Sequence, residues 1–281
     1  MTYAVTGASG NLAGLVAQSL LDAVDPSEVV LVSRRPEALS HFAGADLRLG
    51  DFAAPETLPA AFAGVDALVL VSTDAVGVRL DQQRAAIAAA AAAGVRRIVY
   101  TSAPDPVDDN PALVVPDHAG TEAALRDSGL QWTALRNNLY AHMQVPSVQQ
   151  AIASGQLVTN AGDGRTAYVT REDCAAVAAA VLVQEGHDGK AYDVTGPAAL
   201  GADDLAALAG ELGGTPVEVV HVDDDTYVKG LVGAGLPEEM ARVVASFGAA
   251  AREGHLDTVA TTVADLTGRA PTSLREVIGL P

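Results

Sequence analysis

Gly7-Ala8-Ser9-Gly10-Asn11-Leu12-Ala13-Gly14 follows the short apolar run Tyr3–Thr6 and opens the helical pattern of Asn11–Ala23. Glycine permits a tight turn and lets a pyrophosphate approach the backbone, while the helix that follows offers free N–H groups and the positive end of its dipole. A strand, a glycine turn and an amphipathic helix in this order are typical of dinucleotide-binding proteins. The alternative is an ordinary glycine-rich turn. The spacing is Gly-x-x-Gly-x-x-Ala, and Ala13 keeps the third position small enough for the helix to pack on the strand.

Short β-rich runs alternate with helical runs through the first half of the chain. Strands are expected at Tyr3–Thr6, Val29–Val32, Ala45–Leu49, Ala67–Val71, Arg97–Thr101 and Gln131–Leu135. Helices are expected at Asn11–Ala23, Pro55–Phe62, Leu80–Ala93 and Asp117–Asp127. Continuous apolar strands that alternate with helices indicate a parallel sheet covered on both faces. The fold class is therefore α/β, a doubly wound Rossmann sheet.

The second half of the chain is less regular and predicts a smaller, mostly helical C-terminal lobe. Helices are expected at Ser147–Ala153, Arg171–Val183, Ala202–Leu212 and Pro237–Ala251, and strands at Gln156–Val158 and Lys190–Val194. We expect residues 1–136 to form the dinucleotide-binding domain, with 156–195 returning to it. Residues 137–155 and 196–281 are expected to form the lobe over the open end of the sheet.

Composition and charge exclude several classes of protein. The 281 residues carry a formal net charge of −18, which repels nucleic acid and anionic membranes. The single cysteine, Cys174, rules out a disulfide framework within the chain and is expected to be a buried core residue. Neither a signal peptide nor a transmembrane segment is expected, which favours a cytoplasmic protein. The histidines show no metal-ligand spacing, and Asp223-Asp224-Asp225 is expected to cap a helix.

Ser33-Arg34-Arg35 follows the second expected strand, where the adenosine ribose of a bound dinucleotide lies. An acidic residue there would bind the ribose 2′-OH and repel a 2′-phosphate, whereas arginine matches a phosphate in charge and geometry. The cofactor is therefore predicted to be NADP(H), with Arg34 as its phosphate ligand; the alternative is that these arginines are only solvated. Asp51-Phe52 follows the third strand, where the Asp can accept from the adenine amino group and the Phe can flank the ring.

An ordered set of short motifs resembles the NmrA-like, atypical short-chain dehydrogenases/reductases, and within them the type 2 quinone oxidoreductase group. The matching pieces run through nearly the whole chain: Thr6–Gly10, the Arg34 region, Gly50-Asp51-Phe52, Gly94-Val95, Ile98–Ser102, Asp117-His118, Thr121-Glu122, Ser128-Gly129-Leu130, Leu135-Arg136-Asn137, Tyr140, Gly162-Asp163-Gly164, Leu266-Thr267-Gly268 and Pro271-Thr272.

The resemblance implies binding of NADPH and reduction of a quinone. It also implies that Val71–Thr73, Thr101–Ala103 and Asn137–Leu139 line the nicotinamide end. Together with the motifs above, the residues predicted to bind the cofactor are Gly7, Ser9, Gly10, Asn11, Leu12, Arg34, Asp51, Phe52, Val71, Ser72, Thr73, Thr101, Ser102 and Asn137.

The usual catalytic pair of this superfamily, Tyr-x-x-x-Lys, is missing. The chain has two lysines, Lys190 and Lys229, and neither stands four residues after a tyrosine. His118 and Glu122 occupy the corresponding helix with i, i+4 spacing and therefore share one face. A carboxylate beside the imidazole would raise its pKa and could support a proton relay. The alternative is a structural or surface pair.

Candidate substrate residues follow the strand that ends near Leu135. Asn137 and Asn138 stand where ligands gather at the carboxyl ends of parallel strands; the alternative is a polar turn. Asn138 and Tyr140 are predicted as catalytic residues together with His118 and Glu122. Tyr140 and His142 are expected either to line a substrate cleft or to pack within the second lobe.

The missing Tyr-x-x-x-Lys pair constrains the reaction. Reducing a simple ketone generates a strongly basic alkoxide, whereas reducing a quinone leaves a phenolate-like anion whose conjugate acid has a pKa of about 10. The first hypothesis is therefore an NADPH-dependent reductase of quinones or related conjugated carbonyls. The alternatives are a non-catalytic dinucleotide sensor of the NmrA type and a ketoreductase or isomerase of secondary metabolism. A homodimer is left open.

Overall fold

Seven parallel strands form the central sheet of this computed structural model, which describes residues 1–75 and 77–280. The order of the strands is β3-β2-β1-β4-β5-β6-β8, so the chain winds outward in both directions from β1. The strands are β1 (Tyr3–Thr6), β2 (Val29–Ser33), β3 (Asp46–Leu49), β4 (Ala67–Leu70), β5 (Arg97–Ser102), β6 (Gln131–Asn137) and β8 (Lys190–Val194).

Every residue of β1, β2 and β4 is buried, because helices cover both faces of the sheet. The register places Tyr3 beside Val29 on one side and beside Ala67 on the other. All three strands therefore end at the same edge, where the loops after them meet.

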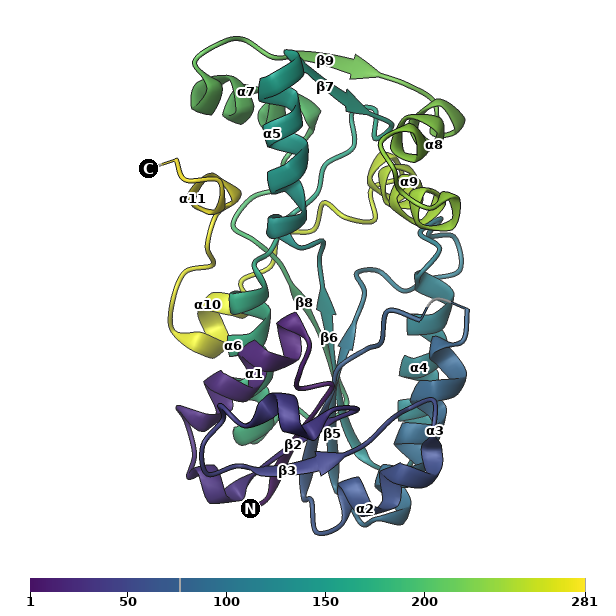
Figure 1. Cartoon of the computed structure of the whole chain (residues 1–281), viewed down its shortest axis with the longest axis vertical. Helices are drawn as coiled ribbons and strands as arrows, with labels where there is room; N and C mark the ends of the chain where they lie inside the picture. Colours follow the sequence, from purple (N-terminus) through teal and green to yellow (C-terminus); the bar gives the residue numbers. More distant parts are fainter. Residues whose placement is uncertain (76, 281) are drawn as a thin grey trace.

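Two groups of helices cover the two faces of the sheet. Leu12 and Val16 of α1 pack with Val177 of α6 on the face that receives Val5. Phe62 of α2, Ile87 of α3 and Leu125 of α4 pack on the opposite face. Figure 1 shows α1 and α6 on one side of the sheet and α2, α3 and α4 on the other. The helices are α1 (Asn11–Leu21), α2 (Leu58–Phe62), α3 (Arg79–Ala92), α4 (Val115–Asp127) and α6 (Arg171–Val183). The predicted doubly wound α/β fold is confirmed.

A second, smaller group of elements lies beyond the carboxyl end of β6, at the top of Figure 1. It contains a two-stranded parallel sheet of β7 and β9. Two small clusters of apolar residues hold this lobe together, and a third packs α9 against the segment between β5 and α4. Its elements are α5 (Gln144–Ser154), β7 (Gln156–Thr159), α7 (Ala202–Gly213), β9 (Glu218–His221), α8 (Asp224–Gly233), α9 (Glu238–Arg252) and α11 (Leu274–Val277).

Three features of the second half differ from the sequence-based expectation. β7 was expected to return to the main sheet with the segment 156–195, but it pairs with β9, and only α6 and β8 return. β9 was not expected as a strand at all. The helix α10 (Thr262–Thr267) packs on α6 through Val263, so this part of 196–281 covers the sheet rather than the lobe. The exact lobe boundaries stay a prediction.

Along the described ranges 1–75 and 77–280, no helix combines the length and the apolar character needed to cross a membrane.

Candidate functional site

A cavity of about 500 Å³ opens at the carboxyl ends of the central strands. The loops after β1, β2, β3 and β4 line it, and Tyr140 joins them from the segment after β6. Its lining residues are Gly7, Ser9, Gly10, Asn11, Leu12, Ala13, Val32, Arg34, Arg35, Gly50, Asp51, Phe52, Ala53, Val71, Ser72, Thr73, Asp74, Ala75, Gln82 and Tyr140.

The glycine loop has the backbone that a phosphate site needs. Gly7 has a φ of +65°, a conformation that side chains disfavour, and its carbonyl accepts from the Gly10 N–H at 2.7 Å. A Cβ on Gly10 would lie 3.2 Å from that carbonyl oxygen. Gly10 is also the N-cap of α1 and offers no side chain to its first N–H groups, which are therefore left for a ligand.

The loop after β2 is tied to the glycine loop by a serine. The Ser33 hydroxyl donates to Oγ of Ser9 at 3.0 Å and accepts from the Arg35 N–H at 3.1 Å. Arg34 and Arg35 are exposed, and within the described chain their side chains make neither ion pairs nor hydrogen bonds. Two unpaired guanidinium groups at the cavity wall are suited to bind a phosphate.

The loop after β3 supplies Gly50, Asp51 and Phe52. A Cβ on Gly50 would overlap Cγ1 of Val32, so no larger residue fits there unless this buried side chain moves. One oxygen of the Asp51 carboxylate accepts from the Ala53 N–H at 2.9 Å, which fixes the side chain at the cavity wall. Phe52 packs partly on the core and partly lines the cavity.

Val71, Ser72 and Thr73 line the cavity after β4, as predicted. Thr101 is buried, and its hydroxyl accepts from the Ser72 N–H at 2.8 Å. Thr101, Ser102 and Asn137 are not among the lining residues, so Thr101 acts on the cavity through Ser72. Their predicted contact with the cofactor stays a prediction.

Tyr140 is the one predicted catalytic residue that the structure brings to the cavity. The guanidinium carbon of Arg171 lies 4.8 Å from the centre of its ring. Burial raises the pKa of the phenol well above its ordinary value, and the nearby Asn137 amide and the Arg171 charge oppose this rise. The hydroxyl therefore keeps its proton at neutral pH.

His118 and Glu122 belong to two different polar clusters. His118 contacts Arg79 and Tyr100, and burial together with the Arg79 charge lowers the imidazole pKa to about 3. The Glu122 carboxylate instead accepts from Ser102, Arg126 and Arg136. The predicted proton relay required the Glu122 carboxylate to raise the pKa of His118. In the structure the two side chains have different partners and the His118 pKa is lowered, so the predicted relay is wrong.

Asn138 is buried, and its side chain makes hydrogen bonds within the protein. Its amide nitrogen donates to the Leu256 carbonyl at 2.9 Å, and its amide oxygen accepts from the Leu139 N–H at 2.8 Å. The side chain therefore joins the segment after β6 to the end of the small lobe. His142 was expected either to line a substrate cleft with Tyr140 or to pack in the second lobe. Its Nε2 lies 3.3 Å from Oε2 of Glu172.

Two structural expectations outside the cavity are confirmed. Cys174 of α6 is buried in the core, and burial raises the pKa of its thiol. Asp223 caps α8 by accepting from the Thr226 N–H at 2.7 Å.

Sequence reasoning missed several lining residues. Arg35 and Gly50 stand in the motifs that marked Arg34 and Asp51, but they were not predicted to bind the cofactor. Asp74, Ala75 and Gln82 belong to the loop after β4 and to α3, and no motif marked them.

Comparison with known proteins agrees with this geometry. Residues 7–185 match the model of a family described as NAD(P)H-binding. The chain is 35% identical over 277 residues to quinone oxidoreductase 2 of Escherichia coli, covering 98% of this chain and 96% of that one. The crystal structure of that NADPH-dependent enzyme in complex with NADPH superposes with a TM-score of 0.94, covering 99% of this chain and 98% of that chain.

Two further relatives are reductases. The structure of Citrobacter sp. triphenylmethane reductase in complex with NADP(H) has a TM-score of 0.91 at 34% identity and covers 99% of both chains. An NAD(P)H azoreductase of Xenophilus azovorans is 29% identical over 97% of this chain and 95% of its own. The resemblance read from the sequence motifs is confirmed, and the chain belongs to the NAD(P)H-binding family, among relatives that include NmrA-like oxidoreductases and quinone oxidoreductase 2.

Proposed function

We propose that this protein is an NADPH-dependent reductase that transfers hydride to a quinone or a related conjugated acceptor. The observation that carries the proposal is one cavity that joins the glycine loop, two arginines after β2 that have no ion-pair partner among the described residues, and the protonated phenol of Tyr140. The relatives' names specify quinone, azo and triphenylmethane acceptors.

The cavity walls fit NADP(H) at three places. The free N–H groups of α1 suit a pyrophosphate, and Arg34 with Arg35 suits a 2′-phosphate. Val71, Ser72 and Thr73 would hold the nicotinamide end. NADPH bound there supplies a hydride, which carries two electrons and a proton.

The acceptor chemistry suits a site without Tyr-x-x-x-Lys. A quinone that takes up a hydride becomes a hydroquinone anion, and one proton from solvent then completes the neutral hydroquinone. The conjugate acid of such an anion has a pKa of about 10, so little help from a strong acid is needed. The Tyr140 hydroxyl, with its raised pKa, supports the acceptor oxygen as a hydrogen-bond donor rather than as an acid.

The test is direct. The protein is mixed with NADPH, and the loss of nicotinamide absorbance is followed with 1,4-naphthoquinone, an azo dye and cyclohexanone. We expect rapid turnover with the quinone and slow turnover with the ketone. Fast ketone reduction with inert quinones would favour the ketoreductase. Binding of both NADP⁺ and NADPH without any turnover would favour the dinucleotide sensor.

A cytoplasmic location and a homodimer stay predictions. Sedimentation of the protein with and without NADPH measures its oligomeric state.

A further inference from the structure

Arg171 carries a positive charge in a strongly acidic chain, and no carboxylate of the described residues forms an ion pair with it. The sequence carries 35 acidic and 17 basic residues, and most of the arginines make ion pairs with carboxylates. The guanidinium of Arg171 packs 4.8 Å from the Tyr140 ring centre. Among the residues that the structure describes, its side chain has no ion-pair or hydrogen-bond partner.

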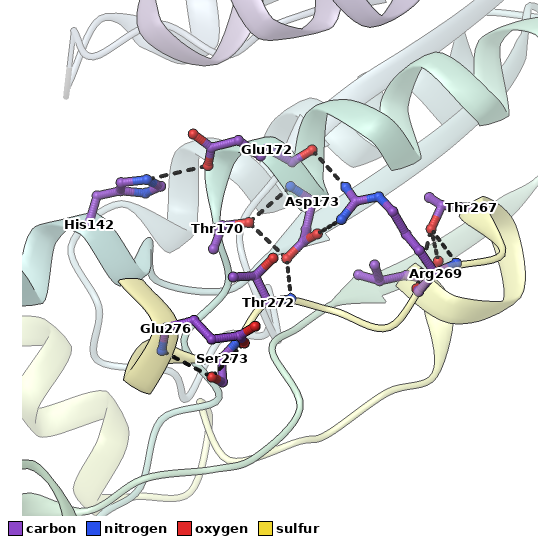
Figure 2. A network of polar contacts seen from close by, with 10 residues as sticks. His142, Thr170, Glu172, Asp173, Thr267, Arg269, Thr272, Ser273 and Glu276 are labelled. Atoms are coloured by element: carbon purple, nitrogen blue, oxygen red, sulfur yellow. Dashed lines mark hydrogen bonds and ion pairs between the residues drawn. The ribbon is translucent and has the colours of Figure 1, made fainter. Parts of the chain in front are cut away.

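Both acidic residues that follow Arg171 are engaged elsewhere, as Figure 2 shows. Glu172 lies 3.3 Å from Nε2 of His142. Asp173 is fully buried, and its carboxylate accepts from Thr170 at 2.7 Å, from Arg269 at 2.6 Å and from the Thr272 N–H at 2.8 Å. These bonds fix the first turn of α6, so Arg171 is held against Tyr140 while its nearest acids are occupied.

Arg34 and Tyr140 both line the cavity, and Arg171 is next to it through its contact with the Tyr140 ring. Arg34 follows β2 and Tyr140 follows β6, and three strands separate β2 from β6. Four strand spacings amount to about 19 Å. Tyr140, with Arg171 packed on its ring, therefore follows a strand far along the sheet from the strand that Arg34 follows.

We propose that Arg171 determines acceptor specificity by binding a sulfonate, carboxylate or phosphate group carried on the conjugated ring of the acceptor. This inference rests on the proposed reductase function, with Tyr140 at the acceptor end. A planar guanidinium matches such oxyanions through paired N–H donors, and the aromatic face of Tyr140 orients it. The net charge of −18 repels anionic acceptors, so a local cation beside the cavity is what admits them.

The experiment compares two matched acceptors, 1,2-naphthoquinone and 1,2-naphthoquinone-4-sulfonate, at saturating NADPH. In Arg171→Gln we expect the ratio of kcat/KM for the sulfonate to that for the neutral quinone to fall about tenfold, the effect of losing one charge-assisted contact. Arg171→Lys should retain part of the preference, because the charge remains. Arg84→Gln is the control, since Arg84 is exposed on α3, makes no ion pair within the described residues and does not line the cavity.

A second readout does not depend on turnover. Binding of 2-naphthalenesulfonate to the NADP⁺-loaded protein, measured by calorimetry, should weaken about tenfold in Arg171→Gln and remain unchanged in Arg84→Gln. If no quinone is reduced but this difference appears, the reductase function fails and the anion site stands.

Three results would overturn the proposal. The first is an unchanged acceptor ratio in a folded Arg171→Gln. The second is a KM for NADPH that rises equally with both quinones, which would assign Arg171 to the cofactor phosphates. The third is sulfonate binding that is indifferent to both Arg171 variants.

Discussion

Nη1 of Arg79 lies 2.9 Å from Nε2 of His118, and this contact assigns the proton on the imidazole ring. Because arginine can only donate, Nε2 must accept, and the proton of the neutral ring lies on Nδ1. Nδ1 then donates to the Tyr100 hydroxyl at 2.7 Å, which in turn donates to Oε1 of Gln83 at 2.9 Å. His118 is thus a neutral link in a buried polar chain.

The buried imidazole should make the protein sensitive to acid. Its pKa of about 3 lies below the ordinary value of 6.5, so between these two pH values the unfolded state binds a proton that the folded state does not. The free energy of unfolding should therefore fall as the pH falls below 6.5, by at most about 1.4 kcal/mol per pH unit from this group. His118→Gln should be less stable at neutral pH but should show a shallower decline. Urea unfolding across this range measures both slopes, and equal slopes would contradict the assignment.

Glu122 is expected to stabilise the fold without taking part in the reaction. Its side chain is 1% exposed and pairs with Arg126 and Arg136. Glu122→Gln should lower the free energy of unfolding by about 2–3 kcal/mol, because two guanidinium groups lose their charge partner. Quinone reduction well below the unfolding midpoint should stay within about threefold of the wild type, since this carboxylate does not line the cavity.

The matched control for this variant is Glu238→Gln, because Glu238 pairs with Arg242 on the surface with its side chain 66% exposed. It should cost about 0.5 kcal/mol. A hundredfold loss of kcat in a folded Glu122→Gln would show instead that Glu122 takes part in the reaction.

Arg34 is expected to distinguish the two nicotinamide cofactors. Arg34→Ala should weaken NADPH binding by about tenfold or more and leave NADH binding unchanged, because only NADPH carries the 2′-phosphate. Fluorescence titration with each cofactor measures this, with Arg35→Ala beside it to divide the effect between the two arginines. Equal weakening for both cofactors would argue against a phosphate ligand at this position.

Gly50 is expected to tolerate no side chain. A Cβ there would overlap Cγ1 of buried Val32, so Gly50→Ala should cost about 1–3 kcal/mol of stability. Gly230→Ala in α8 is the control, since its Cβ would meet no atom within 4 Å and alanine favours a helix. Thermal unfolding of both variants measures the difference. A neutral Gly50→Ala would mean that β2 can yield at this point.

Tyr140 is expected to support the acceptor through its hydroxyl. Tyr140→Phe keeps the ring under Arg171 and removes the donor, so kcat for a quinone should fall by about tenfold while NADPH affinity is retained. Because the pKa of this phenol is raised, wild-type activity should show no alkaline decline from Tyr140 up to pH 10, its ordinary pKa. A decline near pH 9 that disappears in Tyr140→Phe would contradict the raised pKa.

The sequence by itself determined the fold class and one end of the site. Gly7 to Gly14, the apolar runs and Arg34 are local signals: each is a turn conformation, a periodicity or a charge that neighbouring residues define. The strand order followed from them because parallel βαβ units wind in a restricted way.

The tertiary structure alone decided what the polar residues do. His118 and Glu122 share a helix face, yet His118 contacts Arg79 and Glu122 contacts Arg136. Each side chain packs against different strands and helices, and these supply different partners. Arg171 likewise packs on the Tyr140 ring, while Asp173, two residues further along α6, bonds to Arg269 of the distant C-terminal segment. Periodicity reports which face a side chain occupies, whereas its pKa and its role depend on contacts between residues far apart in the chain.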